Sequence, residues 1–385
     1  KILELGSNAG LGAVLRKRLD ASATTKLLLA GLVPSVILRS LSTLHMSLEL
    51  ANIIFAGLGL LVLNIAASTF TANAIITVPK EGSAADTETI KRRKGIRRTA
   101  AMQLGTMAPA VSTFGFTQEF CGAMFVGFSM LADMPTKLYT LFVVPIVARL
   151  FGDAAGKKEA EAERLAEIAC KLEETPRECW TRRMGNVAAL VKDPFNFSIL
   201  GGLLLAATNT PTTSLGFLGK AIGQLADAQT PILFLIIGLK AQVTGAAPAL
   251  CASLLLLRHG ILAIATAAFL KICLPALTVG AGVTAAAVAA RETARLAVVL
   301  SSQAAVSIIA YGQLSKTMDA CPNLGFDLDL AFQIVSISFL ASVVLSTGAA
   351  LGGNAYVNGL SFVGLGMIGM SQVVYRMFKK QIDDL

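Results

Sequence analysis

Apolar blocks about 20 residues long follow one another along this chain, and they restrict its fold more than any other feature of the sequence. An α-helix of that length crosses the hydrocarbon core of a bilayer. The 54% hydrophobic and 15% charged residues, with a mean hydropathy of +0.67, are far from the composition of soluble domains. The short alternating segments of a membrane barrel are absent from the sequence. The sequence therefore predicts an all-α integral membrane protein that crosses the bilayer many times.

Eleven candidate membrane spans can be delimited, as two sets of five followed by one more. Each span is an apolar run bounded by charged or turn-forming residues. The first set covers residues 2–15, 24–41, 48–71, 99–121 and 123–151, the second covers 195–207, 215–239, 248–277, 294–312 and 328–351, and the last span covers 357–378. The first span is short and the chain begins without methionine, so we expect further residues upstream of Lys1.

The two sets of spans predict four consecutive regions. We expect a first five-helix repeat over residues 1–151, a polar connector over 152–188, a second five-helix repeat over 189–352, and an extra C-terminal hydrophobic helix with its tail over 353–385. The connector has apolar residues on one helical face and Glu and Lys elsewhere, which is typical of a solvated amphipathic helix. A platform for a partner protein is the alternative.

Basic residues set the orientation of the spans. Clusters at 16–18, 91–98 and 157–183 follow spans one, three and five, and another at 376–380 ends the last span. An excess of Lys and Arg marks the cytoplasmic or equivalent face, so these loops share one side of the membrane. Eleven crossings fit this pattern, and so do ten crossings plus a surface helix. The net charge of +9 thus reflects membrane topology, and no nucleic-acid partner is expected.

Reactive groups do not cluster in the sequence. The six cysteines form no Cys-x-x-Cys pair and show no clustering with histidine, so neither a disulfide framework nor a zinc site is indicated. No nucleophile–base or metal-ligand pattern occurs either. We therefore expect no enzyme, no bound metal and no cofactor.

The two halves of the chain resemble each other at two places. "GLVPSVILRSLSTLHMS" (31–47) resembles "AQTPILFLIIGLKAQVTG" (228–245), and "VSTFGFTQE" (111–119) occupies the place of "LSSQAAVS" (300–307). Because each half has five spans, the second half enters the membrane from the opposite side. The result is an inverted-topology repeat, an architecture that builds its binding site near the midplane from discontinuous helices.

The sequence also resembles a known family, the auxin-efflux-carrier (PIN-like) permeases. The resemblance is carried by "ALVKDPFNFSILGGLLLAATNTP" (189–211) and "LGKAIGQLADAQTPILFLIIGLKAQ" (218–242), and by "STFGF" (112–116) in the fourth span. It implies a ten-helix fold of two inverted five-helix repeats, shared with bile-acid/sodium symporters. Spans one, two, six and seven would form a scaffold, and spans three to five and eight to ten a mobile core. Helices four and nine would unwind and cross in that core.

The crossover is where we expect the site. From the first half it would hold Thr113, Thr117, Gln118 and Glu119, and from the second half Ser301, Ser302, Gln303 and Ser307. The family usually has a proline at each crossover, and neither of these two neighbourhoods contains one. The polar side chains would satisfy backbone groups freed by the unwinding.

Glu119 is the only charged residue between Thr99 and Ala132. A carboxylate at membrane depth is costly, so it would act as a proton carrier or belong to a cation site. The alternative is a structural role at a helix cap. For Arg258, within the eighth span, the resemblance favours an interfacial anchor, and for Asn64 we expect packing between helices.

The predicted function is a secondary transporter that moves a small organic solute by elevator-type alternating access. The alternative is a transporter fold without transport activity that serves as a structural subunit of a larger membrane complex. Expected partners are the lipid bilayer, the solute, and a proton or cation for coupling. The sequence is compatible with a homodimer and with a larger complex. It is also compatible with the plasma membrane, the endoplasmic reticulum and an organelle inner membrane as the location of the protein.

Overall fold

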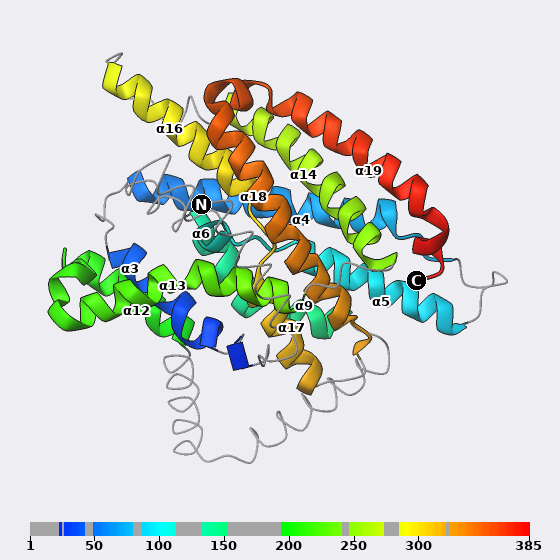
Figure 1. Ribbon diagram of the computed structural model, residues 1–385, viewed down its shortest axis with the longest axis horizontal. Coiled ribbons are helices and arrows are strands. Elements are labelled where there is room, and N and C mark those ends of the chain that lie inside the picture. Colours follow the sequence, from blue (N-terminus) through cyan, green and yellow to red (C-terminus); the bar gives the residue numbers. More distant parts are fainter. Residues whose placement is uncertain are drawn as a thin grey trace. The chain divides into compact units, whose positions relative to one another are not determined.

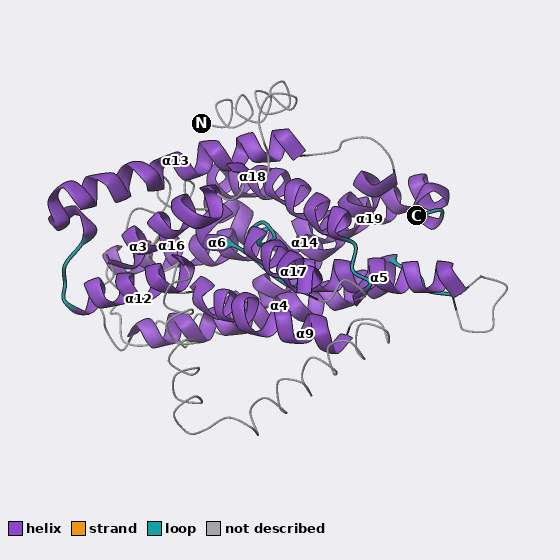
Figure 2. Ribbon diagram, turned by 90° about the horizontal axis from the view of Figure 1, so that it is seen from below, coloured by secondary structure: helices purple, strands orange, loops and turns teal. Residues whose placement is uncertain are grey.

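The computed structural model describes most of the chain as helices. The described residues are 23–24, 27–42, 49–79, 87–112, 132–151, 194–240, 246–272, 285–320 and 324–385. Within these ranges there is no strand (Figure 2). Three of the described helices are long and apolar enough to cross a membrane, at Ile54–Ile75, Ala247–Ile272 and Leu328–Asn358. The prediction of an all-α protein with membrane-spanning helices is therefore confirmed.

The chain divides into two compact units, and each unit takes segments from both halves of the sequence. The first unit consists of Lys1–Met46, Arg149–Lys240 and Asp319–Leu324, and the second of Ser47–Ala148, Ala241–Met318 and Gly325–Leu385. Of the described residues, the first unit contains those of the predicted spans two, six and seven and the last ones of span five. The second unit contains the described residues of the other spans and the rest of span five.

The first unit is built on three helices that pack together. A π-helical turn, η1 (Leu28–Leu32), continues into α3 (Val33–Ser42), which contacts α12 (Pro194–Ala207) and α13 (Gly216–Lys240) (Figure 1). The short η4 (Thr212–Leu215) links the last two. The backbone N–H of Thr212 donates to the hydroxyl of Ser42 over 3.1 Å, which ties the end of α3 to this link.

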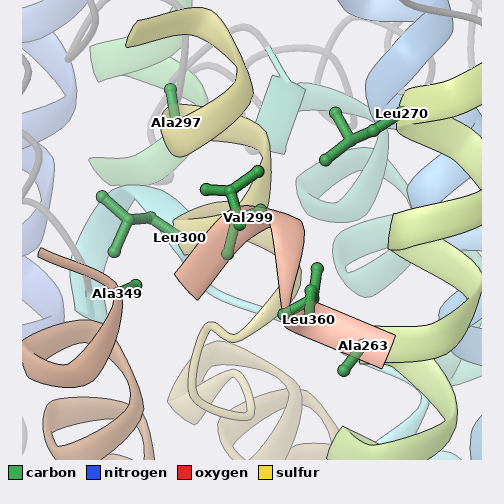
Figure 3. Packing of buried hydrophobic residues seen from close by; sticks show 8 residues of the cluster. Ala263, Leu270, Ala297, Val299, Leu300, Ala349 and Leu360 are labelled. Carbon is green, nitrogen blue, oxygen red and sulfur yellow. The ribbon is translucent and has the colours of Figure 1, made fainter. Parts of the chain in front are cut away.

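The second unit contains most of the other described helical residues. Its elements are α4 (Glu49–Ile75), α5 (Thr87–Leu104), α6 (Pro109–Ser112), η3 (Tyr139–Val143) continuing into α9 (Val144–Phe151), α14 (Ala246–Ile272), α16 (Ala285–Ser302), α17 (Ile308–Ala320), α18 (Leu328–Asn358) and α19 (Leu360–Asp383). The last residues of α9 (149–151) and of α17 (319–320) belong to the first unit. One buried apolar cluster joins four helices of the second unit, with Ala263 and Leu270 from α14, Leu300 from α16, Ala349 from α18 and Leu360 from α19 (Figure 3). Burial of these side chains holds the C-terminal helix against the rest of the unit.

The extra C-terminal helix is an integral part of the second unit. α19 runs along α14 (Figure 1), and the two helices approach closely at a pair of glycines. A Cβ atom built on Gly364 would lie 2.6 Å from the backbone oxygen of Gly260. Further along, the Ser371 hydroxyl donates to the carbonyl of Ser253 over 2.8 Å. Small residues at such a crossing let two helix backbones touch.

The basic segment at 91–98 differs from the prediction, because it is not a loop. It lies inside α5, which begins at Thr87 with Glu88 in its first turn. Lys and Arg are good helix formers, and an acidic first turn suits the helix dipole. Arg93 is buried and contacts Asp383 near the end of α19. The basic part of α5 and the end of the last span therefore lie together, as the predicted orientation requires.

Candidate functional site

Two helices of the second unit are interrupted in the middle of apolar sequence. α5 ends at Leu104, residues 105–108 are not helical, and α6 begins at Pro109. α16 ends at Ser302, residues 303–307 are not helical, and α17 begins at Ile308. Proline suits the first position of a helix because its missing N–H would be unpaired there in any case. These interruptions fall in the fourth and ninth predicted spans, the two that were expected to be broken.

The two interruptions are hydrogen-bonded to each other. The N–H of Ala108 donates to the carbonyl of Ala305 over 2.9 Å. The N–H of Ala305 in turn donates to the hydroxyl of Ser112 over 3.0 Å. The side-chain amide of Gln103 reaches across to the carbonyl of Ser307, also over 3.0 Å. Chain segments 193 to 204 residues apart thus satisfy each other's unwound backbone groups, as buried polar groups require.

The second interruption also has partners on α18. The N–H of Val306 donates to the hydroxyl of Ser338 over 3.0 Å. The side chain of Gln303 lies 2.9 Å from the hydroxyl of Tyr356. Tyr356 follows Gly353, whose φ of 48° and ψ of −129° interrupt α18. Glycine is nearly the only residue that adopts such a conformation, so the bend that precedes Tyr356 depends on it.

The structure places half of the predicted site residues at this crossover. Ser301, Ser302, Gln303 and Ser307 are all buried, at or beside the second interruption. The other four, Thr113, Thr117, Gln118 and Glu119, lie outside the described residues.

The first interruption precedes those four residues, and Gly105 and Pro109 frame it. Gly105 was expected to permit a bend in the fourth span, whereas Pro109 was missed, so a proline does follow the first break. Gln103 and Ser112 were missed as crossover residues, although polar side chains beside a Gly and a Pro within an apolar run are a sign of a broken helix. Tyr356 carried no such sign.

Arg258 lies at the centre of α14, and the interpretation as an interfacial anchor is wrong. Its side chain is 0% exposed, as is that of Asn64 on α4. The Arg258 Nε donates to Asn64 Oδ1 over 2.9 Å, and Asn64 Nδ2 donates to the carbonyl of Leu104 over 3.2 Å. Leu104 is the last residue of α5. The guanidinium group is thus linked through one amide to the end of the broken helix.

The charges around the first interruption are complementary. The C-terminal end of a helix carries a partial negative charge, and Arg258 brings a positive charge close to that end of α5. Among the described residues, no carboxylate forms a hydrogen bond or ion pair with Arg258. His259 Nε2 lies 3.3 Å from the Arg258 Nη1.

The described part of the chain contains no group of three or more His, Cys, Asp or Glu side chains that could hold a metal ion. What it offers at the crossover is a set of buried hydroxyls, amides and unwound backbone groups, which are suited to hydrogen bonding. No model of a known protein family matches the chain, and no match was found among curated proteins.

Proposed function

We propose that the chain is a secondary transporter of the auxin-efflux-carrier type, with two inverted five-helix repeats and an added C-terminal helix. One observation carries the proposal: the backbone hydrogen bond from Ala108 to Ala305, which joins interruptions from the two halves of the chain. Unsatisfied backbone groups at membrane depth cost several kcal/mol each. Two facing interruptions are therefore characteristic of helices that line a binding site near the midplane.

In this proposal the crossover is the binding site for a small organic solute. Ser301, Ser302, Gln303 and Ser307 would line it from the second half. Thr113, Thr117, Gln118 and Glu119 would line it from the first half, with Glu119 carrying a coupling proton or contributing to a cation site. Hydroxyl and amide groups can bind a neutral polar or a charged solute, so the solute is defined only as small and organic.

The division into two units supports an elevator mechanism. Both interruptions belong to the second unit, so that unit could move as one body and take the site with it. The first unit would stay fixed as the scaffold. Rigid-body movement of one bundle against another around a preserved site is the usual form of alternating access.

The experiment is solute counterflow in liposomes containing the purified full chain, with a panel of labelled neutral, anionic and cationic organic solutes. We expect at least one solute to accumulate, and Gln303→Leu to reduce its uptake about tenfold or more, since a polar group in the site is replaced by an apolar one. The matched control is Gln313→Leu on α17, outside the interruption, which should keep wild-type uptake. Glu119→Gln should change the dependence of uptake on pH or cations.

Two outcomes would contradict this function. If Gln303→Leu and Gln313→Leu transport equally well, the crossover is not the site. If no solute moves and the chain purifies from its native membrane with stoichiometric foreign subunits, the structural-subunit alternative is correct. A monomer or homodimer with solute counterflow favours transport.

A further inference from the structure

We propose that Arg258 is a positioning residue that supplies a fixed positive charge to the broken end of α5, in the place where a bound metal cation would otherwise act. The inference deepens the proposed function, because it concerns the same crossover and states how its first half is held. Half-helix ends and unwound carbonyls in transporters commonly coordinate cations. A side-chain cation that is attached to the protein can satisfy the same groups.

The first step is the place of Arg258 in its helix. α14 extends from Ala246 to Ile272, and Arg258 lies near its middle with no exposed surface. An arginine that anchors a helix at the membrane surface would extend its guanidinium into the polar layer. This one is turned into the protein, where a charge is costly unless it is hydrogen-bonded.

The second step is the face of α14 on which Arg258 lies. Leu262, one helical turn further on, packs in a buried cluster with Met107 of the first interruption and Ala304 of the second. Residues four apart share a helix face, so Arg258 is on the face that meets the crossover. Leu60 of the same cluster is likewise one turn from Asn64 on α4.

The third step is the connection itself. Asn64 uses both ends of its amide, accepting from Arg258 Nε over 2.9 Å and donating to the Leu104 carbonyl over 3.2 Å. Hydrogen bonds with a charged partner are roughly twice as strong as neutral ones. These two hydrogen bonds therefore fix the orientation of the Asn64 amide. The guanidinium polarises that amide, which strengthens the hydrogen bond from Asn64 to the Leu104 carbonyl at the helix end.

The fourth step is that the hydrogen bonding of Arg258 is incomplete. Arg258 Nη2 and His259 Nδ1 are buried and have no hydrogen-bond partner in the described part of the chain. A buried charged group is costly unless it is paired and hydrogen-bonded. An arginine whose hydrogen bonding is incomplete is explained if its charge is needed by the broken end of α5.

The test measures thermal unfolding of the full chain in detergent, in potassium chloride and in guanidinium chloride at equal millimolar concentration. Arg258→Ala is expected to lower the Tm by about 5–10 °C. Guanidinium should restore most of that loss, since the free cation can enter the vacated space. Arg258→Met should lower the Tm similarly without rescue, because methionine fills the space and brings no charge.

The matched control is Arg295→Ala. Arg295 also donates to an asparagine oxygen, Asn358 Oδ1 at 3.0 Å, but at an exposed position. Its loss should change the Tm by no more than about 1–2 °C, with no rescue by guanidinium.

Two results would overturn the proposed role: that Arg258→Met unfolds at the wild-type temperature, or that guanidinium raises the Tm of both alanine variants equally. Should Arg258→Ala fail to fold, Arg258→Lys must be more stable than Arg258→Met, and the opposite order overturns the proposal.

The result separates this inference from the proposed function. Guanidinium rescue in a chain that transports none of the tested solutes would leave the positioning role intact and remove the transport function. If the chain carries out solute counterflow and its Arg258→Met variant keeps the wild-type Tm, the transport function stands and the positioning role of Arg258 is overturned.

Discussion

Replacing Gly364 with leucine is expected to destabilise the second unit by about 3 kcal/mol. The substitution puts a side chain where α19 and α14 touch. Its Cβ would lie 2.6 Å from the carbonyl oxygen of Gly260, 2.8 Å from a side-chain carbon of Ile264 and 3.2 Å from the Cβ of Ala263. A backbone oxygen cannot turn away as a flexible side chain can, so the two helices would have to separate.

The measurement is thermal unfolding of the full chain in detergent, with Gly366→Leu as the control. Gly366 lies on the same helix, and a Cβ built there meets no atom within 4 Å. We expect a fall in Tm of several degrees for Gly364→Leu and a change close to zero for Gly366→Leu. Equal behaviour of the two variants would contradict the close packing of α19 on α14.

Asn64→Leu is expected to have a comparable or larger effect, about 3–5 kcal/mol. Leucine has the same branched arrangement of side-chain heavy atoms as asparagine but offers neither an acceptor to Arg258 nor a donor to the Leu104 carbonyl. The substitution leaves the buried Arg258 Nε and the Leu104 carbonyl without their Asn64 partner, and each of these groups then carries a desolvation penalty.

The control for this variant is Asn358→Leu. Asn358 also accepts a hydrogen bond from an arginine, Arg295, but it is exposed, and surface pairs contribute about 0–1 kcal/mol. If urea or thermal unfolding shows that Asn64→Leu is much less stable than Asn358→Leu, the result supports the buried connection. If both variants are as stable as the wild type, the Asn64 amide does not connect Arg258 to the end of α5 in a way that stabilises the fold.

The positions of several helices could be predicted from the sequence, because length and hydropathy determine them. The span predicted over 48–71 corresponds to α4, and the one over 248–277 corresponds closely to α14. The second interruption was anticipated through the internal repeat and the family resemblance, which imply an unwound ninth helix at "LSSQAAVS" (300–307).

The features that were missed depend on distant partners. Arg258 bonds to a residue 194 positions away, and no local pattern tells a buried arginine in an apolar run from one at the membrane surface. Pro109, which begins the helix after the described interruption, was missed because the crossover was expected further along the fourth span, at 113–119. The contact of Gly364 with Gly260 likewise becomes visible only when α19 is placed on α14.

The most direct test of the paired interruptions is a disulfide cross-link between Ala108→Cys and Ala305→Cys, in a full chain otherwise free of cysteine and kept in its membrane. The backbone hydrogen bond between these residues, 2.9 Å long, predicts that the two thiols form a cross-link on mild oxidation. Ser253→Cys with Ser371→Cys serves as the positive control on α14 and α19. If the control pair cross-links in this membrane preparation and the 108–305 pair does not, the two broken helices do not meet and the transport site proposed here does not exist.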